Sequence, residues 1–261
     1  MPFYLKRIIL TYSLLLIIPL VILIITIEYT TKLYKESIYD NTSLMLTNLY
    51  QTLDNQIYEL NDRKESIFKN STFIKSIPQS ALPKNERYRY VQVKNYLYSI
   101  CSNSYSDIFI YYAESDVIIP AKTSVTDSKT YYQTVLGDSD LSYEKWIDKI
   151  TSYSNGSYST IKISNAGETI MYSCLTPYFS GPKKRENGIY INFVFNASWI
   201  QSLLNQNTIY DSKSEIALCI PDQKILLSTD ERFKDEELVF EDGMYFREIS
   251  SDEWAVHAQT S

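Results

Sequence analysis

The stretch "LKRIILTYSLLLIIPLVILIITIEYTTKLYKE", from Leu5 to Glu36, decides how the rest of the chain is interpreted. Its apolar part runs from Ile8 to Ile27 with few interruptions, and a helix of about 20 residues spans a bilayer core. A cleaved signal peptide has a shorter apolar core followed by small residues, yet the first Ala is Ala81 and the first Gly is Gly137. The stretch therefore predicts an uncleaved transmembrane helix, with a buried core helix as the alternative.

The orientation of this helix follows from its flanks. Lys6 and Arg7 precede the apolar run, and Lys32 and Lys35 follow it, so the count of basic residues at the two ends is equal. The basic N-terminus is short enough to stay inside while the long remainder is translocated. We therefore predict a cytoplasmic tail at 1–7, a transmembrane helix at 8–28, and the main domain outside the cell membrane.

The charge of the exterior part argues against nucleic acid binding. All 31 Asp and Glu lie at or beyond Glu28, and 23 of the 25 Lys and Arg lie there too, which gives a formal charge of −8. A surface of this sign is a poor partner for nucleic acid, so no direct nucleic acid contact is expected.

The sequence also offers little for catalysis. The chain has one histidine, His257, and three widely spaced cysteines, Cys101, Cys174 and Cys219. It has no CxxC pair and no glycine-rich phosphate loop, so the usual parts of metal and nucleophilic chemistry are missing. We expect no enzyme, no catalytic residues, no metal and no cofactor.

A long amphipathic helix is predicted after the membrane span. Residues 29–76 contain no Gly and no Pro, and apolar residues recur at helical spacing. Four of them share one heptad position: Leu46, Leu53, Leu60 and Ile67. This stripe either packs on its own domain or also forms the face of a homodimer.

The remainder predicts an α+β fold with antiparallel sheets. A second helix is expected from Arg87 to Ser102, and "NASWIQSLLNQ" predicts another, with Asn196 or Ser198 as its cap. Strand patterns follow in order: "DIFIYYAESDVIIP", the hairpin "YSTIKISNAGETIMYSCLTPYF", "GIYINFVF", "SEIALCIP", "DQKILLSTD", "GMYFREIS" and "EWAVHAQ". We assign one sheet unit to 77–211 and a smaller one to 212–261.

The order of these elements resembles the extracytoplasmic double Cache sensor region of membrane-bound AraC-type transcription regulators of Gram-positive bacteria. The residues that carry the resemblance are "RIILTYSLLLIIPLVILI", "LYQTLDNQIYELNDRKESIFKNSTFIKSI", "DIFIYYAESDVIIP", "YYQTVL", "SYEKWIDKI", "IMYSCLTPY" and "GIYINFVFNASWIQSLL". Sensor histidine kinases share much of this layout. The resemblance implies PAS-like antiparallel-sheet units and a function as the input region of a signal-transducing regulator.

The resemblance also implies parts that this chain does not contain. Such receptors continue into a second membrane span and a cytoplasmic output module, so we expect the chain to be the input half of a receptor. Two further functions stay open at this point. One is an anchored extracytoplasmic binding protein without a signalling role, and the other is a membrane-bound enzyme acting on glycans.

The resemblance implies a small-molecule ligand, for which carbohydrate is one class that the family suggests. The aromatic–arginine–aspartate motif of Cache domains that bind amines and amino acids is absent, because "SKTYYQTVL" lacks the Arg–x–Trp–Tyr run. Aromatic and polar groups that converge in a cleft form the expected binding site. The residues proposed for it are Tyr111, Tyr131, Tyr132, Trp146 and Tyr172.

Overall fold

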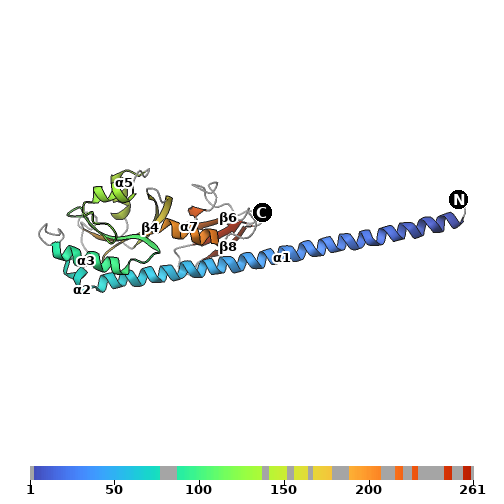
Figure 1. Ribbon diagram of the computed structural model, residues 1–261, viewed down its shortest axis with the longest axis horizontal. Coiled ribbons are helices and arrows are strands. Elements are labelled where there is room, and N and C mark those ends of the chain that lie inside the picture. Colours follow the sequence, from blue (N-terminus) through green and yellow to red (C-terminus); the bar gives the residue numbers. More distant parts are fainter. Residues whose placement is uncertain are drawn as a thin grey trace. The chain divides into compact units, whose positions relative to one another are not determined.

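The computed structural model describes residues 3–76, 87–136, 141–151, 156–163, 167–177, 188–206, 215–219, 225–228, 244–248 and 255–259. The chain divides into two compact units, Met1–Met45 and Leu46–Ser261. The helices, most of which are labelled in Figure 1, are α1 (Phe3–Lys69), α2 (Ser71–Ser76), α3 (Arg87–Ile100), α4 (Ser128–Tyr131), the π-helix η1 (Tyr132–Leu136), α5 (Tyr143–Thr151) and α7 (Ala197–Gln206). The strands are β1 (Tyr105–Tyr112), β2 (Val117–Pro120), β3 (Ser157–Ile163), β4 (Gly167–Leu175), β5 (Ile189–Phe195), β6 (Glu215–Cys219), β7 (Ile225–Ser228), β8 (Met244–Glu248) and β9 (Ala255–Gln259).

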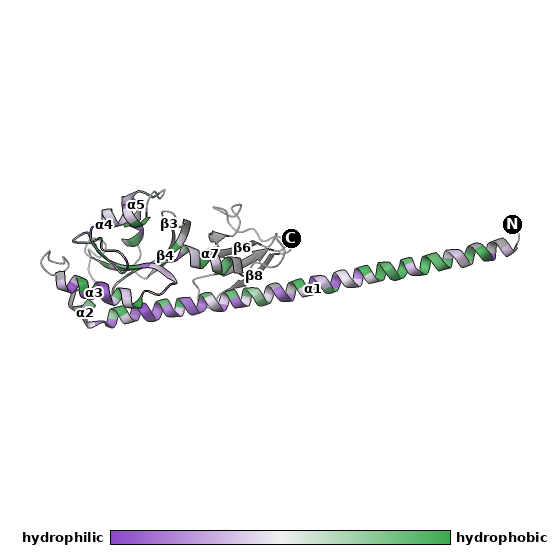
Figure 2. Ribbon diagram, in the orientation of Figure 1, coloured by the Kyte–Doolittle hydropathy of each residue, from purple (hydrophilic) through white to green (hydrophobic). Residues whose placement is uncertain are grey.

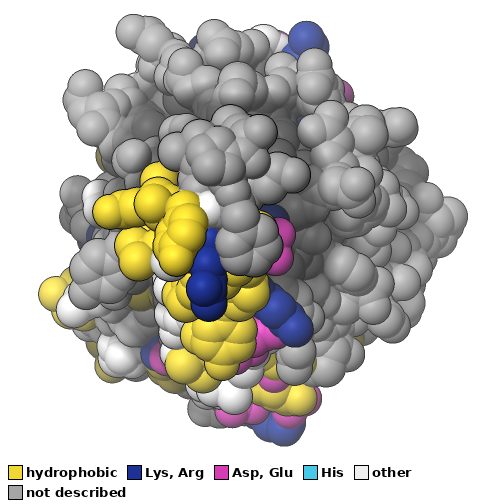
Figure 3. Space-filling view, turned by 90° about the vertical axis from the view of Figure 1, so that its right-hand side faces the viewer, with side chains coloured by type: hydrophobic (Ala, Val, Ile, Leu, Met, Phe, Trp, Pro, Cys, Tyr) yellow, Lys and Arg dark blue, Asp and Glu magenta, His cyan; other side chains and the backbone are white. Residues whose placement is uncertain are grey.

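The first unit is the N-terminal part of α1, and its side chains are exposed throughout 10–37. In the described part of the chain, α1 is the one helix that is long and apolar enough to cross a membrane. Its green, hydrophobic stretch near the N-terminus is visible in Figure 2, and hydrophobic side chains cover much of the described surface in the end-on view of Figure 3.

The threonine side chains in and beside this apolar stretch are satisfied inside the helix. The hydroxyls of Thr11, Thr26 and Thr30 donate to the carbonyl oxygens four residues earlier, at 2.8, 2.8 and 2.6 Å. In hydrocarbon, every polar group needs such an internal partner. Pro19 lies inside the helix, which membrane helices tolerate.

The long helix ends earlier than the sequence predicted. Instead of one helix over 29–76, α1 ends at Lys69 and the short α2 follows a break at Asn70. The Phe73 N–H donates to Asn70 Oδ1 at 3.0 Å, so Asn70 caps α2 as asparagine often does. A cap of this kind interrupts a helix without Gly or Pro, which is why the sequence pattern missed it.

The second unit is built on a five-stranded antiparallel sheet with the order β2-β1-β5-β4-β3. The helices α1 and α7 cover one face, where Leu53, Ile170, Phe195 and Ile200 line a common apolar cavity. We call this the helix face. The opposite face is covered by α4, η1 and α5, whose buried side chains form one cluster with those of the strands. We call it the aromatic face.

The predicted apolar stripe of α1 lies inside this unit. Leu46, Leu53, Leu60 and Ile67 are 2%, 5%, 0% and 0% exposed. Side chains that one chain already covers cannot also bind a second copy. Of the two alternatives, the structure therefore favours packing on the chain's own domain over a dimer face.

A second antiparallel sheet has the order β7-β6-β9-β8, so β9 pairs with a neighbour on each side. These strands coincide with the four predicted segments, and the α+β fold class is confirmed. The charged loop "ERFKDEELVFEDG" lies outside the described residues. The predicted division into 77–211 and 212–261 stays a prediction.

Candidate functional site

The aromatic face is the buried surface on which most of the predicted site residues meet. Alternation along a strand sends every second side chain to the same face, which places Phe109, Tyr111, Met171, Tyr190 and Val194 together. Tyr131, Leu136, Trp146 and Ile150 of the covering helices complete the cluster. Aromatic rings thus lie both on the strands and on the helices that cover them.

Trp146 lies at the centre of the rings and is fully buried. Its ring centroid lies 5.5 Å from that of Tyr132 and 6.0 Å from that of Tyr143. The Phe109 and Tyr131 rings are 6.1 and 6.3 Å away, and Tyr131 stacks on the indole at 26°. Such offset ring pairs stabilise the packing beyond the burial of their area.

The structure brings together four of the five predicted binding residues: Tyr111, Tyr131, Tyr132 and Trp146 all lie in or against the aromatic cluster. Tyr172 lies elsewhere, because side chains alternate between the two faces along β4 and that of Tyr172 points to the helix face. There its ring is 4.8 Å from that of Tyr158, and Lys64 Nζ of α1 lies 5.6 Å from the Tyr172 centroid.

Sequence reasoning missed two polar residues of the aromatic face, Ser173 and Asn192. They are cross-strand partners in β4 and β5, and they are 1% and 0% exposed. Within the described part of the chain, the Ser173 hydroxyl, the Asn192 side-chain oxygen and the Trp146 Nε1–H on the same face are buried without a hydrogen-bond partner. The signal in the sequence was one polar residue, Asn192, inside the apolar strand "INFVF".

The three residues that carry these unpartnered groups are linked to one another by contacts that include Phe109. Asn192 pairs with Phe109 on one side and with Ser173 on the other, and Trp146 packs on the Phe109 ring. Buried polar groups are nearly always hydrogen-bonded in folded proteins. Three open groups on one patch therefore indicate a place that a polar partner fills.

Asp107 is the buried carboxylate of the aromatic face, and it is fully engaged. Its Oδ1 accepts from the N–H groups of Ile108, Ala121 and Lys122 at 2.9, 3.0 and 3.1 Å, and its Oδ2 accepts from the Tyr131 hydroxyl at 2.9 Å. Burial raises the pKa of Asp107, while these four donors act against that rise. Asp107 thus fixes Tyr131 and the end of β2 instead of serving a ligand.

A second carboxylate, Asp116, ties the cover to the turn between β1 and β2. Its Oδ1 accepts from the Ser128 hydroxyl at 2.6 Å, from Tyr111 at 3.0 Å and from Tyr143 at 3.1 Å. Burial and the nearby Asp116 carboxylate raise the pKa of Tyr143 to about 12, so its hydroxyl stays a donor at neutral pH.

Two backbone features of this region are unusual. Asp116 has φ 52°, a conformation that costs energy for a residue other than glycine. The cover also contains a π-helical turn, η1, a geometry that is rare and frequently lies at functional sites. Both features belong to the cover of the aromatic face or to the turn that the cover contacts.

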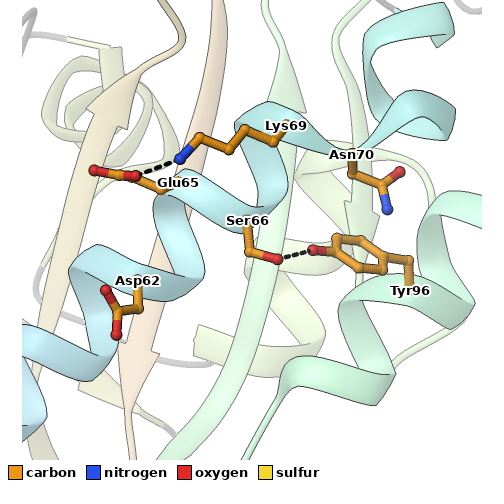
Figure 4. Close-up of a pocket in the computed structure, with 6 residues that line it drawn as sticks. All are labelled: Asp62, Glu65, Ser66, Lys69, Asn70 and Tyr96. Carbon is orange, nitrogen blue, oxygen red and sulfur yellow. Dashed lines mark hydrogen bonds and ion pairs between the residues drawn. The ribbon is translucent and has the colours of Figure 1, made fainter.

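A groove lies elsewhere, between α1 and α3 (Figure 4). It encloses about 540 Å³, and its lining residues are Asp62, Glu65, Ser66, Lys69, Asn70 and Tyr96. Lys69 Nζ lies 2.7 Å from Glu65 Oε2, and the Ser66 and Tyr96 hydroxyls are 2.6 Å apart. Of these six described residues, none has a buried side-chain polar atom without a partner, which distinguishes the groove from the aromatic face.

Metal and thiol chemistry find no support in the described part of the chain. Within it, no three His, Cys, Asp or Glu side chains gather as metal ligands would. Cys101 and Cys174 are free thiols, and burial raises the pKa of Cys174 to about 12, which disfavours the reactive thiolate. The side chains of Cys219 and His257 lie outside the described residues.

Comparison with solved structures finds sensor domains. The ligand-binding domain of the Pseudomonas aeruginosa amino acid chemoreceptor PctC, in complex with GABA, is 10% identical over 84% of this chain and 95% of that one, with a TM-score of 0.48. The ligand-binding domain of the Pseudomonas fluorescens chemoreceptor CtaA, in complex with L-valine, is 12% identical over 82% and 91%, with a TM-score of 0.49.

The sensor domain of the Vibrio cholerae histidine kinase DctB is 12% identical over 81% of this chain and 98% of that one, with a TM-score of 0.41. No protein-family model and no curated protein matches the chain. With TM-scores below 0.5, these neighbours are similar to the chain without identifying it, so its function is argued from its own residues.

Proposed function

We propose that this chain is the membrane-anchored, extracytoplasmic input region of a signal-transducing protein. It binds a small molecule on the aromatic face and passes the effect to α1. The N-terminus is inside the cell, the second unit is outside, and no enzymatic activity is involved.

The observation that carries this proposal is the placement of two consecutive residues of β4. Ser173 presents to the aromatic face a hydroxyl that has no partner among the described residues. Tyr172 faces α1, where the Lys64 ammonium lies 3.4 Å from its hydroxyl and 5.6 Å from its ring centroid. A ligand that moves this strand changes the surface on which α1 packs. A ligand shifts such an equilibrium only through different affinities for the two arrangements.

A parallel contact joins α1 to β1. The Arg63 guanidinium lies 5.7 Å from the ring centroid of Tyr105, and Arg63 is also bonded to Glu59 one turn earlier. Two neighbouring cations of α1 therefore lie against rings on two different strands. A change in the spacing of β1 and β4 therefore alters both of these contacts and acts directly on α1.

As the output we propose a transcription regulator of the AraC type, with a DNA-binding domain outside this chain. A histidine kinase is the alternative output, and an anchored binding protein without signalling is the alternative function. The choice between the outputs does not alter the role proposed for the aromatic face.

Hydrogen exchange of the full chain in lipid nanodiscs tests the proposed coupling. The probes are amino acids, sugars, nucleosides and dicarboxylates, each added in excess. A probe that binds is expected to slow exchange in β4 and also to change exchange in α1 near Lys64. Lys64→Met should remove the change in α1 while leaving the affinity unaltered.

Protection confined to the aromatic face, with α1 unchanged, would favour the anchored binding protein. A control variant, Lys69→Met, alters a lysine of α1 whose ion pair with Glu65 is exposed. It should leave both binding and the response of α1 as they are.

A further inference from the structure

The three open hydrogen-bonding groups of the aromatic patch are all uncharged. They are an indole N–H that only donates, a hydroxyl that both donates and accepts, and an amide oxygen that only accepts, belonging to Trp146, Ser173 and Asn192. A partner that satisfies all three must itself offer at least one acceptor and one donor.

The carboxylates near this patch are already used. Asp107 receives four hydrogen bonds from the protein, three at Oδ1 and one at Oδ2, so an ammonium group in the buried region has to compete with these donors. Asp116 is engaged by three hydroxyls at the rim. Neither carboxylate is open to a cationic ligand.

An anionic ligand finds no counter-charge there either. Among the described residues, no Lys and no Arg is buried, so none lies among the buried groups of the aromatic face. The cations Arg63 and Lys64 lie over Tyr105 and Tyr172, on the helix face. Burying a charge without a partner costs several kcal/mol, so a buried carboxylate would be strongly disfavoured.

From these groups we infer that the ligand of the aromatic face is an uncharged molecule that carries hydroxyl or amide groups on a ring or another apolar frame. The inference rests on the proposed function, because it assigns a ligand class to the same site. The rings of Phe109, Tyr131 and Trp146 pack on one another on the same face as the open polar groups, and they suit the apolar faces of such a frame.

The test uses the full chain in nanodiscs, labelled with ¹⁵N-tryptophan, and observes the indole N–H signal of Trp146. That signal is assigned by its loss in Trp146→Phe. Three probe sets are added separately. They are uncharged sugars, polyols and nucleosides; amino acids and polyamines; and dicarboxylates and phosphate.

The expected result is a shift of the Trp146 signal by a member of the first set alone. Ser173→Ala should then weaken that probe about three- to tenfold, the effect of one lost hydrogen bond. Thr169→Val is the matched control on the same strand and face, because the Thr169 hydroxyl is already bonded to the Phe195 carbonyl oxygen at 2.8 Å. It should leave the affinity unchanged.

The contrary outcomes separate this inference from the proposed function. A charged probe that shifts the Trp146 signal and is weakened by Ser173→Ala would overturn the inference and leave the sensor proposal standing. No shift with any of the three sets would overturn the inference, and an ordered water bonded to Ser173 and Asn192 in a crystal structure would overturn the proposed binding site as well. An affinity for an uncharged probe that Ser173→Ala does not change would also overturn the inference.

Discussion

The two faces of the first sheet are both buried but are covered in different ways. On the helix face, a long helix lays a stripe of Leu and Ile on the strands. On the aromatic face, the cover consists of three short elements, two of which, α4 and α5, are held by hydrogen bonds to Asp107 and Asp116. A cover of short pieces opens at lower cost than a continuous helix. In the proposed function, ligand entry therefore belongs to the aromatic face and transmission to the helix face.

The polar atoms of the two faces differ as well. Among the described residues, the helix face also has buried atoms without partners, Gln56 Oε1 on α1 and the Tyr105 hydroxyl on β1, but these two residues are not joined by strand pairing. Gln56 borders a cavity lined otherwise by apolar side chains. On the aromatic face, the open groups belong to paired residues of adjacent strands and to the indole above them. The two faces therefore differ in whether the open polar groups lie on paired residues, more than in the number of such groups.

The largest expected effect is on the cover of the aromatic face. Asp107→Ala leaves the Tyr131 hydroxyl and the N–H groups of Ile108 and Lys122 without this acceptor, while the Ala121 N–H keeps its bond to the Ile108 carbonyl oxygen at 2.8 Å. The free energy of unfolding should fall by about 3–5 kcal/mol, as measured by urea unfolding of the full chain in nanodiscs. Asp107→Asn, which keeps an acceptor oxygen, should lose less. Equal losses would show that the hydrogen bonds are not the cause.

A comparable but smaller loss is expected on the helix face. Leu60 is fully buried in the stripe of α1, and Leu60→Ala should lower the free energy of unfolding by about 3 kcal/mol. The matched control is Tyr58→Ala, because Tyr58 is on the same helix and 63% exposed. Its effect should stay within about 0.5 kcal/mol. A much smaller loss of unfolding free energy with Leu60→Ala would mean that α1 packs loosely on the sheet.

The contact between α1 and β4 should contribute less to stability than to coupling. Lys64→Met removes the ammonium from the Tyr172 ring and hydroxyl, and the free energy of unfolding should fall by about 0.5–1 kcal/mol. Thermal unfolding monitored by circular dichroism measures it. Tyr172→Leu also removes packing on Tyr158 and Phe193, so the loss in the double variant should fall short of the sum of the two single losses by about 0.5–1 kcal/mol if Lys64 and Tyr172 act as one contact.

The sequence was sufficient to predict the helices and strands, but not the different roles proposed for the two faces of the first sheet. Hydrophobic period and turn residues predicted the long apolar helix, α3, α7 and the strands. Asn196 proved to be the cap of α7, with its Oδ1 accepting from the Ser198 N–H at 3.0 Å. The break at Asn70 was missed, because a polar cap gives a weak signal beside continuous helical periodicity.

The site was predicted in part for a similar reason. Aromatic residues stand out in a sequence, so Tyr131 and Trp146 were named, but the face of Tyr172 depends on strand register, which becomes known only when β4 pairs with β5. Ser173 and Asn192 were missed because their importance lies in what they do not contact. A missing hydrogen bond cannot be read from composition or spacing.

The smallest expected change tests the central claim most directly, namely that open polar groups on the aromatic face are kept for a ligand. It compares the free energies of unfolding of Ser173→Ala and Thr169→Val, two deletions of a buried hydroxyl on one face of β4. Thr169→Val removes a satisfied bond to the Phe195 carbonyl oxygen and should lose about 1 kcal/mol. Ser173→Ala removes a hydroxyl that has no partner among the described residues, so the ligand-free chain should keep its stability or gain up to about 1 kcal/mol. A loss with Ser173→Ala as large as that with Thr169→Val would contradict the account, because the Ser173 hydroxyl would then have a partner within the protein.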